Sequence, residues 1–300
     1  MNESAKSKVM AMSSQTKGEF YTFGLTIIES WFPIFAFFTV HALGALHAYF
    51  YSLLVAIVCL SVWWVLRGKT HEIKYRAAYK NIALTTFFIT SLFALTFIAL
   101  QYTSATNVVI ILFLQILFSY LFLGRRKEES LSPKHALGAL FMTIGGLLVL
   151  FPGSFQVNMG DLLVLFAAMI APIANLYQKK ARAQVSSETI LVVRSVLALP
   201  FIYVLAIIFE QQPTLNAIQE QWYWLVLTGV LVFFVSKLLW VEAIHLLPIT
   251  KVNALFAFAP LMTMALAYWL LAQTPTLHQL IGIGPILLGS FLIMQKPAKT

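Results

Sequence analysis

The stretch NIALTTFFITSLFALTFIALQYTSATNVVIILFLQILFSYLFLG, residues 81–124, contains no Asp, Glu, Lys or Arg. A second charge-free stretch covers residues 252–295, VNALFAFAPLMTMALAYWLLAQTPTLHQLIGIGPILLGSFLIMQ. Each is long enough for two membrane-spanning helices of about 20 residues, joined by a short polar turn. Both stretches are continuously apolar instead of alternating, so they predict helices and not the strands of a membrane barrel.

The rest of the chain has a similar composition. Of its 300 residues, 60% are hydrophobic and 10% charged, whereas a soluble domain carries about 25% charged residues. The predicted fold is therefore an all-α integral membrane protein. Apolar runs separated by polar breaks predict ten transmembrane helices, at about residues 20–42, 45–66, 81–100, 105–123, 135–152, 160–179, 188–209, 222–244, 252–271 and 277–295.

The basic residues predict the orientation of these helices. Among the 20 Lys and Arg residues, Arg194 and Lys237 lie deep within predicted spans, and the others fall at the end of a span or in segments that share one side of the membrane with the amino terminus. Cytoplasmic loops are enriched in Lys and Arg. We therefore predict a multi-pass protein of the cell membrane with both termini in the cytoplasm. The net charge of +9 is explained by this topology, so no nucleic-acid partner is expected.

The chain contains an internal repeat. A shift of 144 residues aligns Ala99 with Ala243, Thr106 with Thr250, Gly138 with Gly282, Gly145 with Gly289 and Leu148 with Leu292. Five spans in each half would make the second half cross the membrane in the opposite direction, as in many secondary transporters. The predicted organisation is a cytoplasmic tail (1–19), a first five-helix repeat (20–152), a second five-helix repeat (153–295) and a second cytoplasmic tail (296–300).

A family resemblance rests on two equivalent segments. ALQYTSATNVVIILFLQILFSYLFL (99–123) and EAIHLLPITKVNALFAFAPLMTMALAYWLL (242–271) resemble the two halves of an EamA-type transporter of the drug/metabolite transporter superfamily. The resemblance covers Gly18 to Met294 and implies two inverted five-helix halves, alternating access, and a central cavity lined mainly by helices 1, 3, 4, 6, 8 and 9. The chain departs from the family pattern at Ile116, which stands at the position of Pro260.

Glu29 is the first candidate functional residue. It lies about 13 Å along the first predicted helix, near the middle of the membrane, at a rise of about 1.5 Å per residue. A carboxylate at this depth is costly unless it is protonated, paired or in a wet cavity. Pro33 follows four residues later and lacks the N–H that would bond the Glu29 carbonyl. We interpret this segment as a binding point for substrate or protons; the alternative is a structural acid bonded to a neighbouring helix.

Two basic residues also lie within predicted spans. Lys237 is predicted to point into the cavity and to pair with Glu29 or with an anionic group of the substrate. The alternative is that its long side chain reaches back to the membrane surface. Arg194 lies only about six residues into its helix, so it is expected to reach the cytoplasmic interface in this way; the alternative is that it reaches the cavity.

The other candidate substrate contacts are polar or aromatic side chains within the spans, namely Gln115, Asn175, Asn253, Trp31 and Trp240. Packing and hydrogen bonding between helices would explain each of them equally well. Pro33 and Pro172 lie in the equivalent first helices of the two halves and are predicted to act as paired hinges.

An enzyme is not expected. Glu242 and His245 form a Glu-x-x-His pair, but a di-iron site needs a second copy and further carboxylates. The sequence has no GxxxxGK[ST] phosphate loop. No metal or cofactor is predicted.

The sequence therefore predicts a secondary active transporter that moves a small metabolite, an amino acid or an organic ion across the cell membrane by alternating access. Its expected partners are this small-molecule substrate, the lipid bilayer and protons, with Glu29 as the group that couples transport to the proton gradient. The direction is open: the family resemblance favours export, while an acid among aromatic residues would also accept an organic cation for uptake. The alternatives are a flippase for a lipid-linked carrier and a membrane scaffold that transports nothing.

Overall fold

The computed structural model describes residues 13–123, 133–150 and 158–294, and all the regular elements in these ranges are helical. The first half comprises α2 (Ser14–Glu29), α3 (Phe32–Leu43), α4 (Ala45–Leu66), η1 (Thr70–Lys74), η2 (Arg76–Ala78), α5 (Tyr79–Ala99), α6 (Ala105–Phe113), α7 (Gln115–Leu123) and α8 (Pro133–Leu150). The second half comprises α9 (Met159–Arg182), α10 (Ser187–Phe209), α11 (Leu215–Leu227), η4 (Thr228–Ser236), α12 (Lys237–Leu246), α13 (Ile249–Leu255), η5 (Phe256–Phe258), α14 (Ala259–Leu271) and α15 (Leu277–Met294). The tail segments 1–12 and 296–300 and the basic residues at 125–127 lie outside the described residues.

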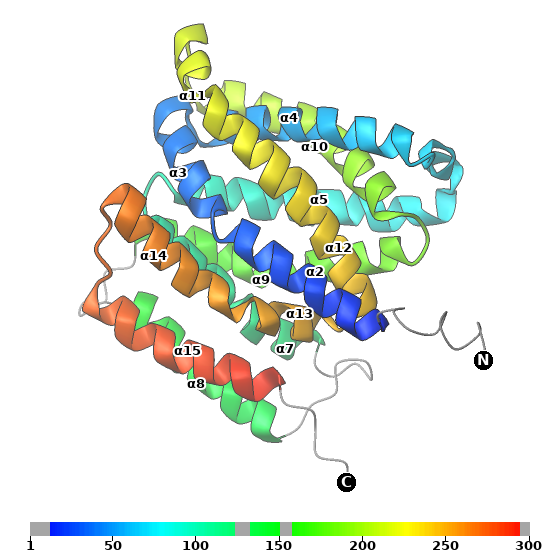
Figure 1. Ribbon diagram of the computed structural model, residues 1–300. Coiled ribbons are helices and arrows are strands. Elements are labelled where there is room, and N and C mark those ends of the chain that lie inside the picture. The colour runs from blue at the N-terminus through cyan, green and yellow to red at the C-terminus, as the bar shows by residue number, and fades with distance from the viewer. Residues whose placement is uncertain (1–12, 124–132, 151–157, 295–300) are drawn as a thin grey trace, which may run out of the picture.

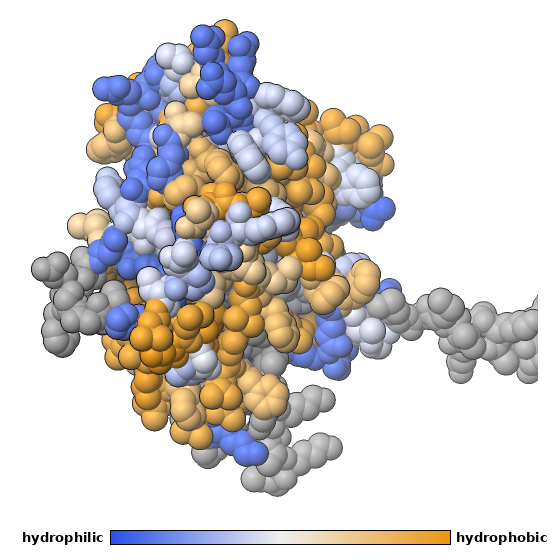
Figure 2. Space-filling model, turned by 60° about the vertical axis from the view of Figure 1, so that its left-hand side comes forward, coloured by the Kyte–Doolittle hydropathy of each residue, from blue (hydrophilic) through white to orange (hydrophobic). Residues whose placement is uncertain are grey.

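The prediction of an all-α membrane fold is confirmed. Within the described residues, seven helical stretches are long and apolar enough to cross a membrane, and three shorter apolar helices lie within α8, α14 and α15. Large apolar side chains cover the outside, such as Trp269 (81% exposed) and Phe209 (73% exposed). Figure 2 shows broad apolar areas on the face it presents. Soluble monomers rarely expose apolar patches of such extent, so this surface fits lipid.

The first helix begins earlier than predicted. α2 starts at Ser14 because the Ser13 hydroxyl accepts a hydrogen bond from the Thr16 N–H at 3.1 Å and caps the helix. Residues 14–19, predicted as part of a cytoplasmic tail, are therefore helical.

Several predicted spans are interrupted. The first divides into α2 and α3 at Ser30 and Trp31, where Pro33 occupies the first turn of α3. The fourth divides at Leu114, and the ninth contains the 3-10 turn η5. These last two interruptions coincide under the 144-residue shift, so they belong to the repeat. α9, by contrast, runs unbroken through Pro172.

Packing between the helices follows the repeat. α8 lies against α15, α4 against α10 and α6 against α14, so that each helix packs on its own equivalent. α5 packs on α9 and α2 packs on α12. These two contacts are equivalent, because the repeat relates α5 to α12 and α9 to α2. Figure 1 shows α8 and α15 side by side at one edge of the bundle.

Four glycines set the distance between α8 and α15. A Cβ added to Gly282 would lie 2.8 Å from the Gly145 carbonyl oxygen, and one added to Gly289 would meet the Gly138 carbonyl oxygen. Glycine allows this close approach of two helices. Because Gly138 corresponds to Gly282 and Gly145 to Gly289, these contacts show that the two equivalent helices run antiparallel, as an inverted repeat requires.

The connections divide between the two ends of the bundle. η1, η2 and the α9–α10 turn lie at one end, on the right in Figure 1, and we call this the η1 end. The α3–α4, α10–α11 and α14–α15 connections lie at the opposite end. Among the described connections, those that carry the basic residues predicted to be cytoplasmic are therefore at the η1 end.

Candidate functional site

A cavity lies at the centre of the bundle. Its volume accessible to a water-sized sphere is about 90 Å³, and it is lined by residues of α2, α3, α5, α6, α7, α9, α10, α12 and η5. The sequence-predicted residues in its wall are Glu29, Pro33, Gln115, Asn175, Lys237 and Trp240. Every helix that the family resemblance placed around a central cavity contributes, and α10 contributes one additional residue, Arg194.

Glu29 and Lys237 form an ion pair in the cavity wall. Lys237 Nζ donates a hydrogen bond to Glu29 Oε1, and the Ser236 hydroxyl donates to the same oxygen. Both side chains of the ion pair are 10% exposed. Lys237 Nζ also lies 4.9 Å from the centroid of the Phe93 ring, within cation–π range. The pairing proposed from the sequence is therefore present, and Lys237 does not reach back to the membrane surface.

The backbone of η4 positions this pair. Residues 228–236 form a π-helical segment that ends at Ser236, directly before Lys237. Such segments are rare and are often found at functional sites. The segment packs closely on α4, because a Cβ on Gly229 would lie 2.7 Å from the Ser52 carbonyl oxygen. This packing fixes the segment that delivers both donors to Glu29.

Arg194 is a second buried cation in the cavity wall. It is 5% exposed, and its Nη1 donates a hydrogen bond to the side-chain oxygen of Gln178, which is itself 1% exposed. The prediction that Arg194 reaches the cytoplasmic interface is wrong. The side chain lies on the inner face of α10, where it bonds the neutral amide of Gln178 and lines the cavity.

Aromatic and amide groups complete the wall. Trp240 Nε1 donates to Asn175 Oδ1 at 2.9 Å, which fixes both side chains. The Trp240 ring lies edge-on to Phe256, with 6.1 Å between centroids. Phe32, Phe93 and Phe113 also line the cavity. Its surface is therefore mostly apolar, with a few polar groups at defined positions, as is usual for small-molecule sites.

The structure places three predicted residues elsewhere. Trp31 stacks on Phe35 at a centroid distance of 5.6 Å and does not line the cavity. Asn253 is fully buried and donates to the Ser119 hydroxyl at 3.0 Å, which joins α13 to α7. Pro172 is buried inside α9 beside the lining residue Ala171.

Sequence reasoning missed Ser236, Gln178 and Phe93 as parts of this site. Ser236 directly precedes Lys237, but nothing in the sequence indicates a π-helical segment that brings both side chains to one carboxylate. Gln178 lies three residues after Asn175 in α9, and this spacing places both on one helix face. That spacing was the available signal for Gln178.

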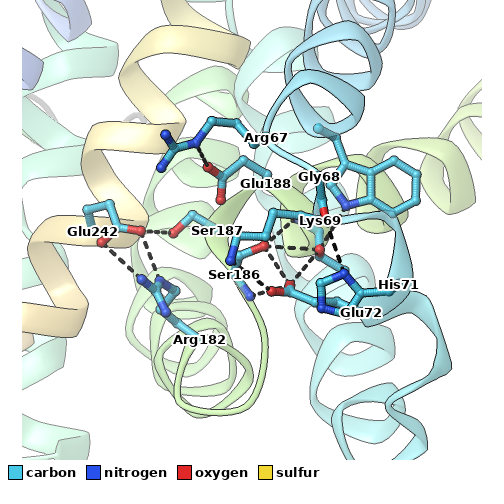
Figure 3. A network of polar contacts seen from close by, with 12 residues as sticks. Arg67, Gly68, Lys69, His71, Glu72, Arg182, Ser186, Ser187, Glu188 and Glu242 are labelled. Atoms are coloured by element: carbon cyan, nitrogen blue, oxygen red, sulfur yellow. Dashed lines mark hydrogen bonds and ion pairs between the residues drawn. The ribbon is translucent and has the colours of Figure 1, made fainter.

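A polar network at the η1 end links the two halves (Figure 3). The Glu72 carboxylate accepts from the Ser186 N–H at 2.7 Å, the Ser186 hydroxyl at 2.6 Å and the Thr189 hydroxyl at 2.8 Å. Lys69 Nζ lies 3.6 Å from the other Glu72 oxygen. Burial acts to raise the pKa of Glu72, but the hydrogen bonds from Ser186 and Thr189 and the charge of Lys69 outweigh it, so the pKa lies below its usual value.

The same network includes a bidentate ion pair. Arg182 donates to both oxygens of Glu242, at 2.9 and 3.2 Å, and the Ser187 hydroxyl donates to Glu242 at 2.5 Å. Glu242 therefore has a structural partner in α9. Within the described part of the chain, no group of three or more His, Cys, Asp or Glu residues is arranged to hold a metal ion.

Comparisons with known proteins agree with this architecture. A curated relative from Synechocystis sp., named Uncharacterized transporter sll1164, is 24% identical over 217 residues, which are 69% of this chain and 62% of the relative. The matched part is thus less than two thirds of that protein's length. A crystal structure described only as that of a protein superposes with a TM-score of 0.73 at 16% identity, covering 93% of this chain and 96% of the other, and shows the likeness of the fold.

The family comparison covers both halves. Residues 16–151 and residues 158–295 each match the EamA-like transporter family. The two matches reproduce the internal repeat and leave out only short segments. The chain therefore belongs to the EamA-like transporter family.

Proposed function

We propose that the protein is a secondary active transporter that binds a small molecule in the central cavity and exposes it to each side of the membrane in turn. Ten spans are proposed, with the η1 end and both termini in the cytoplasm. The observation that carries the proposal is the buried Glu29–Lys237 pair in the cavity wall. A membrane protein keeps charges at this depth at a cost of several kcal/mol, and such charges commonly mark substrate or ion pathways.

Glu29 is the proposed proton carrier and Lys237 its charge partner. Protonation of Glu29 removes the negative charge from the pair and leaves the ammonium group free to interact with a substrate. Deprotonation restores the ion pair. The two states have different affinities for a charged substrate, and this difference couples substrate movement to proton movement.

Equivalent contacts at the two ends support alternating access. At the η1 end, Gly18 packs on Leu247, and at the opposite end Gly160 packs on Thr103. A shift of 142 residues aligns Gly18 and Glu19 with Gly160 and Asp161, and the 144-residue shift aligns Thr103 with Leu247, so the two contacts are equivalent. Two similar closures of comparable geometry suit a protein whose ends open alternately. A scaffold would need neither these closures nor a charged cavity.

A flux measurement tests this function. Purified full-length protein is placed in liposomes that contain a pH-sensitive dye, and a panel of amino acids, amines, nucleosides and carboxylates is added outside. We expect at least one compound to move protons in liposomes containing the protein, and Glu29→Gln to stop this movement. Glu220→Gln, at an exposed residue of α11, is the matched control and should transport normally. Equal proton movement with Glu29→Gln would refute the role of Glu29.

A further inference from the structure

We infer that the substrate is a small organic anion with an apolar body, that its carboxylate binds Arg194, and that it crosses the membrane together with the proton held by Glu29. This inference rests on the proposed function and specifies its substrate class. Three observations support the inference: the charges in the cavity wall, the partners of those charges, and the chemistry of the remaining wall.

The cavity wall has a surplus of positive charge. Its charged residues, within the described part of the chain, are Glu29, Lys237 and Arg194. Glu29 and Lys237 neutralise each other in an ion pair. The hydrogen bond that Arg194 makes goes to Gln178, a neutral amide. One positive charge is therefore left at a site that is almost completely buried.

An anionic ligand would neutralise this charge. A buried cation without a counter-ion is costly, and pairing with a carboxylate removes much of this cost. The guanidinium group presents five N–H donors in a planar fork that matches a carboxylate. Gln178 engages Nη1, and we propose that the carboxylate binds the other donors. An organic amine would instead be repelled by Arg194 and would have to displace Lys237 from Glu29.

The remaining wall specifies the body of the ligand. Five aromatic side chains line the cavity, together with an aliphatic side chain of α6: Phe32, Phe93, Phe113, Trp240, Phe256 and Leu112. Such a surface binds an apolar or aromatic group through burial of its area. A carboxylate joined to a body of this kind satisfies both parts of the cavity.

The direction of coupling follows from the same charges. When Glu29 is protonated, Lys237 and Arg194 remain as two cations, so the cavity binds an anion more tightly. By linkage, a bound anion must raise the affinity of Glu29 for its proton by the same factor. Proton and anion therefore bind together on one side and leave together on the other. The pair carries no net charge, so the transport step is electrically neutral.

Other charged groups near Glu29 do not change this balance. α12 also carries Glu242 and His245, and Glu242 is bonded to Arg182 at the η1 end. From α13, Lys251 bonds Glu19, about three helical turns before Glu29. α9 contributes the neutral Asn175 and Gln178 to the cavity.

A binding experiment tests the ligand class. Thermal unfolding of the purified full-length protein is measured with 3-phenylpropionate, 3-phenylpropanamide and 3-phenylpropylamine, which share one apolar body and differ in charge. We expect the anion alone to raise the Tm at neutral pH, where the carboxylate probe is ionised. Arg194→Gln should weaken anion binding by about tenfold or more, as expected for loss of a charged hydrogen-bonding partner. Arg76→Gln, at an exposed residue of η2, is the matched control and should bind like the wild type.

The outcomes separate this inference from the proposed function. A Tm increase with the amine and not the anion, or no increase with any of the three compounds, would overturn the anion inference. Neither result would affect proton-coupled flux of another compound in the panel described above. Uptake of labelled 3-phenylpropionate adds a second readout. Uptake is counted as the excess over protein-free liposomes, which report passive entry of the neutral acid, and over liposomes with Arg194→Gln. This excess should follow an imposed pH gradient and remain unchanged when valinomycin and K⁺ clamp the membrane potential at zero, whereas an excess that is absent or that follows the potential would overturn cotransport with one proton.

Discussion

Lys251 of α13 lies 2.6 Å from the Glu19 carboxylate of α2, and this ion pair has an equivalent at the other end of the bundle in which an amide takes the place of the lysine. The repeat relates Lys251 to Asn107 and Glu19 to Asp161. Asn107 Nδ2 donates to both oxygens of Asp161, at 3.1 Å each. The two ends of the protein are thus joined by equivalent contacts, one between two charges and one between an amide and an acid.

Removing the Lys251 charge should make opening at the η1 end easier. Both side chains are partly exposed, 29% for Lys251 and 38% for Glu19, so the pair contributes only about 0.2–1 kcal/mol. We expect Lys251→Met to raise the population open at this end by up to about fivefold. The measurement is the labelling rate of a cysteine introduced at the cavity residue Ala171, in a Cys59→Ser background, by an impermeant maleimide applied to inside-out vesicles. Lys74→Met, at an exposed residue of η1, is the control and should leave the labelling rate unchanged. Equal labelling rates for the unsubstituted protein, Lys251→Met and Lys74→Met would contradict the prediction.

The Glu29–Lys237 pair should show different effects on stability and on transport. Removal of one partner leaves a buried charge without its counter-ion, which costs about 3–5 kcal/mol. Glu29→Gln and Lys237→Met should therefore each lower the Tm of the purified protein, or shift the remaining group to its neutral form. The double variant should recover most of the lost stability, because neither charge remains. Transport should be lost in all three variants. Recovery of transport in the double variant would show that the pair is purely structural.

The glycines between α8 and α15 should be sensitive even to a methyl group. A Cβ on Gly145 would meet the Gly282 carbonyl oxygen and the Ile286 side chain. We expect Gly145→Ala to lower the free energy of unfolding by about 1–3 kcal/mol through overpacking, measured by thermal or denaturant unfolding in detergent. Gly24→Ala in α2 is the matched control, because its added Cβ would lie 3.4 Å from the nearest neighbouring side-chain atom, Leu239 Cδ1, which is an ordinary van der Waals distance. That change should be neutral or stabilising, since alanine favours a helix over glycine by about 1 kcal/mol. Equal losses from both changes would argue against close packing at Gly145.

Hydropathy and charge predicted the helices and the Glu29–Lys237 pair, because burial in lipid constrains every position of a span. The repeat was predicted from residue identities at the 144-residue shift. The interruption at Leu114 was not predictable, since no proline or glycine marks it in the sequence. Arg194 was misplaced because its depth along the helix does not reveal which face of α10 turns inward. Pro172 was predicted as a hinge on the analogy with Pro33, yet α9 continues through it. The local sequence thus indicates how deep each charged residue lies along its helix. Which residue it pairs with depends on how the helix is rotated about its axis, and the local sequence does not indicate this rotation.

The protein should lose stability in acid when the Glu72 carboxylate becomes protonated. Its folded-state pKa is lowered, so the carboxylate stabilises the folded state above the unfolded-state pKa of about 4.3, and this contribution is lost as the pH falls through the lower folded-state pKa. Glu72→Gln removes the charge and one set of acceptor interactions with Ser186 and Thr189. We therefore expect the variant to have a lower Tm than the wild type at neutral pH, and the difference to shrink as the pH falls below about 4. Glu220→Gln, at an exposed acid of α11, controls for the general effect of one carboxylate. A difference between wild type and Glu72→Gln that stays constant from neutral to acidic pH would show that the ionised carboxylate does not stabilise the contact between η1 and α10.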